Sequence, residues 1–228
     1  SGNLSFANNP LCRLIERSAF TGGLDGSPNE VRGLLLQQSN LGTIQTDGID
    51  VSLRYSAQLT DMIGLNMSFD GTWTHENVFT AFPGANARDC VGFYSVNCAS
   101  IQPEFAFTQR TSLTFDDTFT ASLMWRYIDE VNVEPEFVGD FLGGNGNPAV
   151  GEFSDFTFIP AEHYFDLSFR WEVTENVQLS FLVQNLLDNK PKVVGSDIGS
   201  TAFNSGNVYP STYDALGRRY AAAVKFRF

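Results

Sequence analysis

Three cysteines are the first residues whose chemistry and spacing carry information: Cys12, Cys90 and Cys98. Cys90 and Cys98 flank a short polar and aromatic stretch between two strand-like segments, and this spacing suits a disulfide that closes a small loop. A zinc site is the rival, but it needs about four ligands, and only His75 and His163 could join the cysteines. We therefore expect a Cys90–Cys98 disulfide, which implies an oxidising compartment, ahead of free thiols and of metal. The leftover Cys12 suggests a partner on sequence outside this chain.

The carboxylates also gather at one place, in an acidic run formed by Asp129, Glu130, Glu134, Glu136 and Asp140. A calcium ion requires several converging oxygen ligands, whereas a solvated face requires no particular geometry. We expect the run to be a solvated face at a strand end and the loop that follows it.

Motifs of the common enzyme classes are absent from the chain. It has no glycine-rich phosphate loop, no Gly-x-Ser-x-Gly elbow and no His-Glu-x-x-His helix. The two histidines lie near predicted strand ends, where a structural role is the simpler interpretation. We expect a protein that is not an enzyme and that carries no cofactor and no metal.

Composition narrows the class of protein further. The chain has 26 acidic and 14 basic residues, a formal net charge of -12 and, at 18%, few charged side chains. Such a balance argues against nucleic-acid binding, which needs a basic face that displaces counterions from phosphates. Its longest unbroken apolar run, Tyr220–Val224, is far shorter than the roughly 20 residues of a spanning helix. A soluble β-protein and a membrane β-barrel both remain open.

Alternation of apolar and polar residues with period two recurs along most of the chain and predicts strands. In the clearest case Phe165, Leu167, Phe169 and Trp171 share one face, and polar residues occupy the other. We expect about eight strands, of which the first is the least regular because three consecutive leucines hide its phase. The expected strands cover 31–38, 49–59, 63–73, 107–115, 119–127, 165–173, 177–183 and 220–228.

The predicted connections alternate strictly between short and long. Tight links lie at about 60–61, 116–117 and 174–176, and long polar segments at about 80–102, 134–160 and 188–213. All long loops therefore lie at one end of the sheet, an asymmetry typical of bacterial outer-membrane barrels.

The two faces of these strands differ in a way that suits lipid on one side and water on the other. A Lys or Arg facing lipid at the bilayer midplane costs about 2–4 kcal/mol, and the apolar faces are nearly free of charge. Tryptophans at positions 73, 125 and 171 lie toward the ends of their runs, where interfacial aromatics belong. A soluble antiparallel sandwich explains the alternation equally well but explains the one-sided loops less well. One residue does not fit: Asp47 falls in the outward, apolar phase of its strand unless Gly48 marks a bulge. The opposite, polar faces carry Arg54, Asp70, Arg110, Arg126, Asp166, Arg170, Lys225 and Arg227.

The last 50 residues resemble the C-terminal end of TonB-dependent outer-membrane receptors. The matching segments are 177–191, with Asn185-Leu-Leu-Asp188 before a long loop, 213–220, with Gly217-Arg-Arg-Tyr220, and the terminal strand that ends in Phe228. An earlier segment, 40–51, also looks like a strand opening of this family, so the resemblance extends from about residue 29 onward.

The resemblance implies an all-β fold, namely an antiparallel transmembrane segment of about eight strands within a larger barrel of the 22-strand type. Residues 1–228 would form a C-terminal portion of such a receptor, without its plug domain and TonB box. Its implied function is active uptake of a siderophore, cobalamin or oligosaccharide across the bacterial outer membrane. The implied partners are outer-membrane lipid, the plug and remaining strands, TonB through the N-terminal region, and a small-molecule ligand. A complete eight-stranded barrel that acts as an adhesin or small pore is the alternative, and a soluble lectin-like sandwich is the third candidate.

Candidate ligand contacts follow from the expected loops and inner wall, and the terminal aromatic resembles the signal that the membrane-assembly machinery recognises. Packing within the loops is the competing interpretation for each aromatic residue. The candidates are Phe82, Phe93, Tyr94, Phe137, Phe141, Phe203, Tyr209, Arg110 and Arg126, with Phe228 as the assembly signal.

Overall fold

The computed structural model describes residues 15–24, 31, 33–34, 40–95, 97–98, 101–135, 157–195 and 207–228. The chain divides into two compact units, Ser1–Gly42 and Thr43–Phe228. Every element within the described ranges, β1 to β13, is a strand, which confirms the predicted all-β class.

The described residues of the first unit contain one short strand pair. Strands β1 (Ile15–Glu16) and β2 (Gly33–Leu34) pair antiparallel, with Ile15 opposite Leu34. The predicted strand over 31–38 is confirmed only at β2, and it pairs with β1 instead of joining the main sheet. Alternation could not reveal this, because the leucine run gives no phase. Cys12 lies outside the described residues.

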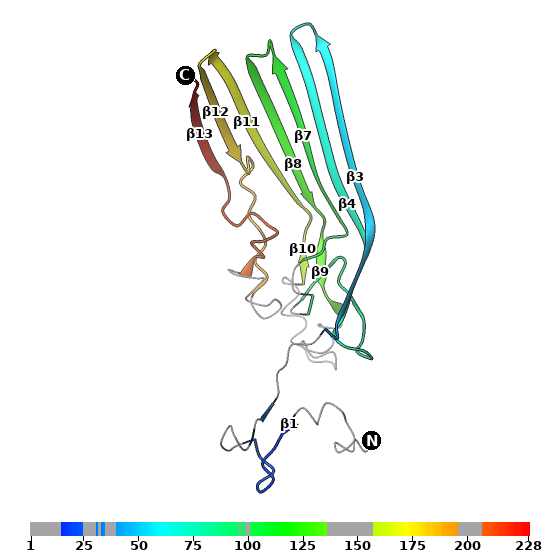
Figure 1. Cartoon of the computed structure of the whole chain (residues 1–228). Coiled ribbons are helices and arrows are strands. Elements are labelled where there is room, and N and C mark those ends of the chain that lie inside the picture. The colour runs from blue at the N-terminus through cyan, green and yellow to red at the C-terminus, as the bar shows by residue number, and fades with distance from the viewer. Residues whose placement is uncertain are drawn as a thin grey trace. The chain divides into compact units, whose positions relative to one another are not determined.

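The second unit is built on an eight-stranded sheet whose long members are all antiparallel (Figure 1). Its order is β13-β12-β11-β8-β7-β4-β3, and β5 adds a short pairing to β4. Apart from that addition, sequence neighbours pair with one another, as in an up-and-down meander. The strands are β3 (Thr43–Thr60), β4 (Ile63–Thr80), β5 (Arg88–Asp89), β7 (Phe105–Phe115), β8 (Phe119–Ile128), β11 (Glu162–Thr174), β12 (Val177–Gln184) and β13 (Arg219–Phe226).

Short turns occupy one end of this sheet and long connections the other, as predicted (Figure 1). Residues 61–62, 116–118 and 175–176 link β3 to β4, β7 to β8 and β11 to β12. In the second turn Asp116 and Asp117 both have positive φ, 47° and 54°, a conformation that Asp tolerates better than most residues. We call the two ends of the sheet the turn end and the loop end.

Strands β3 and β4 are longer than predicted, because their pairing continues toward the loop end past an irregularity. Asp47 lies opposite Glu76 and Gly48 opposite Thr74, so the register shifts between Asp47 and Gly48. A Cβ on Gly48 would lie 2.4 Å from the carbonyl oxygen of Trp73, which explains the glycine. The register irregularity that the sequence allowed at Gly48 is present, with the extra residue, His75, on β4, so β3 keeps its own alternation through Asp47. The pairs beyond it mix polar residues with the apolar pair Ile44 and Phe79.

A second, three-stranded sheet lies at the loop end. Strand β9 (Val131–Val133) pairs antiparallel with β10 (Phe158–Ile159) and parallel with β6 (Phe93–Tyr94). Around it lies the hydrophobic core of the described residues, which we call the loop-end cluster. Its buried members are Tyr94, Ile101, Val131, Val133, Ile159, Val194, Tyr209 and Tyr213.

Candidate functional site

The eight-stranded sheet has an outer face, formed by the odd-numbered residues of β3, β7, β8, β11 and β12, those of β4 up to Trp73, and the even-numbered residues of β13. Its apolar side chains are exposed, and no described element packs over them: Leu53 is 61% exposed and Phe226 60%. Soluble monomers rarely expose a contiguous apolar patch larger than a few hundred Å². Side chains of this face that remain more than a third exposed are Ile49, Val51, Leu53, Tyr55, Leu59, Met67, Trp73, Phe115, Leu123, Trp171, Val173, Leu179, Phe181, Tyr220, Val224 and Phe226.

An aromatic belt crosses the outer face toward the loop end. Phe107 lies at its centre, with ring centroids 4.7 Å from Trp125 and 5.2 Å from Tyr127. His163 joins the belt because its Nδ1 accepts a hydrogen bond from Trp125 Nε1 at 3.1 Å. Trp73 stacks on His75, with centroids 5.4 Å apart. Both histidines are therefore belt members in this structure.

The belt defines the height of the apolar band. On β4 the outer residues are apolar or glycine from Ile63 to Trp73, and on β11 Trp171 lies near the turn end. The ten residue steps from 63 to 73, at about 3.3 Å each and a tilt of about 40°, span about 25 Å. This height equals that of the apolar band of outer-membrane barrels.

The inner face carries the charges, and neighbouring strands connect them. Arg54 on β3 pairs with Asp70 on β4 at 3.0 Å, and Ser52 donates to the same carboxylate at 2.7 Å. Nearer the turn end, Arg227 and Glu172 approach to 3.7 Å. The predicted separation of an apolar and a charged face is therefore present in the structure.

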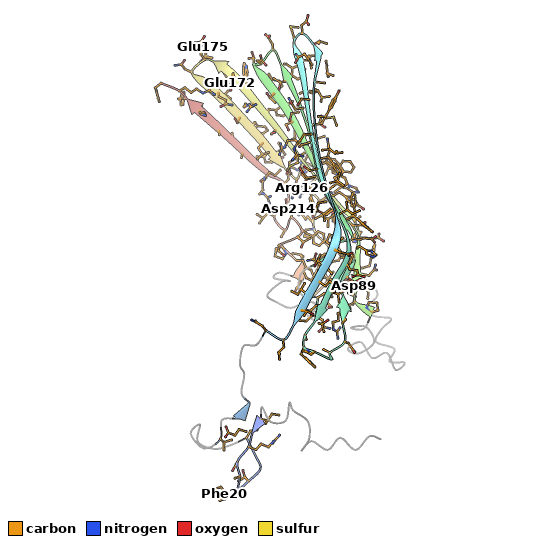
Figure 2. The ribbon with its side chains drawn as sticks, turned by 45° about the vertical axis from the view of Figure 1, so that its right-hand side comes forward. Phe20, Asp89, Arg126, Glu172, Glu175 and Asp214 are labelled. Carbon is orange, nitrogen blue, oxygen red and sulfur yellow. A yellow bond between two sulfur atoms is a disulfide. The ribbon has the colours of Figure 1, made fainter. Side chains whose placement is uncertain are left out.

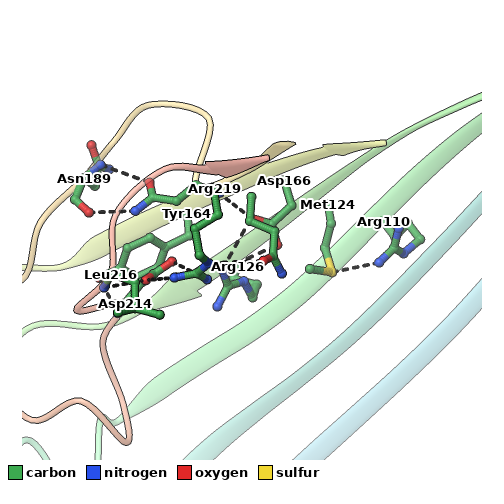
Figure 3. A network of polar contacts seen from close by, with 11 residues as sticks. Arg110, Met124, Arg126, Tyr164, Asp166, Asn189, Asp214, Leu216 and Arg219 are labelled. Carbon is green, nitrogen blue, oxygen red and sulfur yellow. Dashed lines mark hydrogen bonds and ion pairs between the residues drawn. The ribbon is translucent and has the colours of Figure 1, made fainter. Parts of the chain in front are cut away.

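A polar network lies on the inner face where the sheet meets the loops (Figures 2 and 3). Arg126 on β8 lies 3.4 Å from Asp166 on β11, and its guanidinium sits 5.2 Å from the ring centroid of Tyr164. Asp166 also accepts a hydrogen bond from the backbone N–H of Asn185 at 2.8 Å. The Tyr164 hydroxyl accepts the backbone N–H of Asp214 at 3.3 Å. The network thus joins the sheet to the segment that leads into β13.

The two sequence motifs that carry the family resemblance, Asn185–Asp188 and Gly217–Tyr220, contact each other beside this polar network. Asn185 is fully buried with a φ of 50°, and its amide exchanges two hydrogen bonds with the backbone of Asn189, at 2.7 and 3.0 Å. Asp188 accepts the backbone N–H of Arg218 at 2.8 Å. Gly217 has a φ of 72°, and a Cβ there would lie 2.7 Å from Asp188 Oδ1. The two distant motifs therefore form one clasp between β12 and β13.

Asp214 belongs to this clasp and holds Arg219 through two hydrogen bonds, at 2.7 and 3.1 Å. Burial acts to raise the pKa of Asp214, but hydrogen bonds from Arg219 and from the Leu216 backbone, with the Arg219 charge, lower it below the usual value.

The loop-end cluster contains two of the predicted ligand contacts. Tyr94 and Tyr209 are fully buried and meet edge to face, with ring centroids 5.8 Å apart. Burial raises the pKa of Tyr209 to about 12 and that of Tyr94 further. In this structure the two residues pack in the core of the loops, so a ligand could contact them only if the cluster opened.

The predicted disulfide between Cys90 and Cys98 is present. It holds a loop in which Ser95 donates to the carboxylate of Glu134 at 2.7 Å, and the amide of Asn97 donates at 3.3 Å. Arg88 forms an ion pair with Glu134 as well.

The expectation of a solvated acidic run is wrong for Glu134, which is only 3% exposed. Its burial is possible because Arg88, Ser95 and Asn97 compensate the charge. Asp129 accepts the Tyr127 hydroxyl at 2.8 Å. Glu136 and Asp140 lie outside the described residues.

The remaining candidate contacts are dispersed. Phe82 is 44% exposed beyond the end of β4, and Phe93 lies half-buried in β6. Arg110 and Arg126 lie on the inner face, as expected. Phe228 is fully exposed at the chain end. Three further candidates, Phe137, Phe141 and Phe203, lie outside the described residues.

Sequence inspection named Asp166, Asn185 and Glu134 but did not predict that they are buried and hydrogen-bonded. The Asn-Leu-x-Asp motif contained the signal for Asn185, since Asn is prominent among non-glycine residues with positive φ. Nothing in the local sequence marks Asp166 or Glu134, whose partners lie 40 and 46 residues away.

Among the described residues, no helix has the length and apolar character needed to cross a membrane. In the same ranges, no group of three or more His, Cys, Asp or Glu side chains converges as a metal site.

Comparison with known proteins gives structural neighbours only. No family model matches the chain, and a search of curated proteins gives no match. The chain resembles ferric-chelate receptors. The ferric enterobactin receptor PfeA of Pseudomonas aeruginosa is 14% identical, with 80% of this chain and 22% of that protein aligned at a TM-score of 0.48. The ferric-catecholate import receptor Fiu of K12 E. coli is 19% identical, with 82% and 21% aligned at a TM-score of 0.47. The chain thus spans about a fifth of the length of these neighbours.

Proposed function

We propose that this chain forms part of the barrel wall and outer loops of a TonB-dependent receptor that imports a scarce nutrient across the bacterial outer membrane. The observation that carries the proposal is the exposed apolar band of the outer face, bounded by aromatic residues and opposed by a charged inner face. Residues 1–228 would be a C-terminal portion of the barrel, and a plug and further strands would come from the rest of the receptor.

The contrast between the two faces supports lipid on one side and an aqueous lumen on the other. In water the exposed outer side chains would lose about 25 cal/mol for each Å² of apolar area that they fail to bury. In a bilayer the same area meets acyl chains, while the inner ion pairs remain hydrated. A soluble sandwich would cover this face with a second sheet, and no described strand does so.

The backbone of the sheet supports a partner that supplies more strands. β3 and β13 are the terminal strands of the sheet order, and no pairing joins them within the described ranges. Unpaired backbone groups are costly in lipid, so both edges would need neighbouring strands. The alternative of a self-contained eight-stranded barrel would require β3 to pair with β13, and no observation favours it.

The long connections and the loop-end cluster support a ligand-binding role on the outer side, with a siderophore, cobalamin or oligosaccharide as the class of ligand. Uptake would be driven by TonB through the N-terminal part of the receptor. Outer-membrane lipid, the remaining receptor and the nutrient are thus the partners that we propose.

Lipid contact can be tested directly with the intact receptor in vesicles. Trp73, Trp125 and Trp171 lie on the outer face, so bromines on acyl chains should quench tryptophan fluorescence in a depth-dependent manner. Bromines near the headgroups should quench Trp73 and Trp125 more strongly than mid-chain bromines do, as measured in single-tryptophan variants. The proposal fails if the protein is soluble without detergent and brominated lipid leaves all three unquenched.

Transport can be tested in cells that lack the receptor gene and are complemented with it. We expect energy-dependent accumulation of one probe among labelled ferric enterobactin, cobalamin and maltoheptaose, and its loss in a strain without TonB. Accumulation that persists without TonB would argue for a passive pore.

A further inference from the structure

A recess on the inner face lies between two arginines that have no carboxylate partner among the described residues. It has a volume of about 580 Å³ and is bounded by Arg110 on β7 and Arg170 on β11. Arg110 donates to the Ser122 hydroxyl at 3.1 Å and to the Met124 sulfur at 3.0 Å, which directs it over β8. Within the described part of the chain, neither guanidinium lies at ion-pair distance from a carboxylate.

This lack of partners stands out because the chain as a whole is acidic, with 26 carboxylate side chains against 14 basic ones. The inner-face carboxylates that form ion pairs are each held by another arginine: Asp70 by Arg54, Asp166 by Arg126 and Glu172 by Arg227. Among the described residues, the positive charge of Arg110 and Arg170 is therefore not paired with a carboxylate at the recess.

Register places hydroxyl groups between the two arginines. Arg110 lies opposite Met124 and Arg170 opposite Thr120, so the two positions are four residues apart along β8. Ser112, Ser122 and Ser168 form one cross-strand row between them, and Ser112 donates to Ser122 at 2.9 Å. Because these side chains are short, they leave the space that the arginines border. Ser122 accepts from both Arg110 and Ser112, so its own hydroxyl hydrogen can be donated into that space.

We propose that this recess binds a small polyanion with carboxylate or phosphate groups, and that the imported nutrient is accordingly anionic. A guanidinium fork matches both groups geometrically, and charge-assisted hydrogen bonds are about twice as strong as neutral ones. A cleft lined by one sign of charge also raises the local concentration of the opposite ion. The assignment of the nutrient rests on the proposed function, whereas the anion site itself can be measured without transport.

The test uses the intact receptor in detergent micelles, titrated by calorimetry with citrate, with pyrophosphate and with uncharged maltose. We expect saturable binding of at least one anion and none of maltose. Arg110→Gln and Arg170→Gln should each weaken that binding at least tenfold, the size expected for loss of a charge-assisted hydrogen bond. The Arg→Lys variants should recover part of it, because they keep the charge but lose the fork.

Arg54→Gln is the matched control, since it removes the same charge from the same face at a side chain already paired with Asp70. It should change the affinity less than threefold. An equal loss in all three Gln variants would show non-specific attraction and overturn the site. The proposed anion site would also be refuted if the wild type showed no saturable anion binding. That result is expected if an acidic segment of the same polypeptide fills the recess.

The two proposals fail in distinguishable ways. If anions do not bind but brominated lipid still quenches the outer tryptophans, only the anion site is refuted. If brominated lipid does not quench the tryptophans while citrate still binds, the anion site is supported and the proposed receptor function is refuted.

Discussion

The eight-stranded sheet exposes its apolar side chains, whereas the loop-end cluster buries them. In the sheet, Leu53 and Phe226 are among the most exposed apolar residues of the chain, whereas in the cluster Val131 and Ile159 are at most 1% exposed. The sheet places its charges on the face away from its apolar side chains. The cluster instead surrounds itself with compensated polar groups such as Glu134.

Under the proposed function, this difference would adapt one chain to two solvents. The cluster folds by the rule of soluble proteins, since its apolar groups find partners within the chain. Within the described ranges no element packs over the outer face of the sheet, so in the proposed receptor the sheet would rely on its backbone ladder and on the surrounding lipid. The same kind of substitution should therefore change stability differently in the two regions. The predictions below are ordered from the largest expected effect to the smallest.

A charge on the outer face should produce the largest effect. Leu53→Lys, near the middle of the apolar band, should destabilise the protein in vesicles by about 2–4 kcal/mol, because the ammonium would face acyl chains. Its neighbour Ser52 lies on the inner face beside Asp70, so Ser52→Lys should cost less than about 1 kcal/mol. Urea unfolding followed by tryptophan fluorescence measures both. Equal costs at the two positions would refute the assignment of the faces.

Removing the disulfide should weaken the loop end alone. The Cys90→Ser and Cys98→Ser double variant frees a loop closed over eight residues, and the loop-entropy model predicts a loss of roughly 2–3 kcal/mol. Hydrogen exchange should speed up in β6 and β9 but not at the turn end of β11 and β12. Faster exchange throughout the sheet would show that the two regions are not energetically separate.

Loss of the clasp should have a somewhat smaller effect. Asn185→Ala removes two buried hydrogen bonds and places alanine at positive φ, so we expect a cost of about 2 kcal/mol. Asn176→Ala, at an exposed site in the turn between β11 and β12, is the matched control and should cost less than about 1 kcal/mol. Urea unfolding of the two variants compares them. Equal losses would mean that the resemblance motif has no special structural role here.

The smallest effect concerns pH. The folded pKa of Asp214 lies below its unfolded value, so the carboxylate stabilises the clasp above the unfolded pKa, and this contribution disappears as pH falls through the folded pKa. Hydrogen exchange near Arg219 should therefore stay constant from pH 7 to pH 5, after correction for intrinsic rates, and rise in more acidic solution. Asp214→Asn should cost about 1 kcal/mol at neutral pH and abolish the acid-dependent rise. A rise of the same size in that variant would exclude Asp214 as its source.

Much of the sheet was predictable because alternation reports directly which residues share a face. The seven long strands, their tight turns and the loop asymmetry all follow from local sequence, whereas the register shift at Gly48 was only one possibility that the sequence left open. The eighth strand was misplaced, since β5 is only two residues long and has no period to detect. The disulfide was predictable from its short spacing.

The sequence by itself determined the two chemically distinct faces. Successive residues of a strand point to opposite faces, and this alternation does not depend on which strands are its neighbours. Only the tertiary structure decided which polar groups compensate one another: Glu134 with Arg88, Asp166 with Arg126, and Asp188 with the backbone beyond Gly217. It also decided that Tyr94 and Tyr209 pack together and that Arg110 and Arg170 border an open recess. Such contacts join residues distant in sequence, and they form only when strand register brings those residues together.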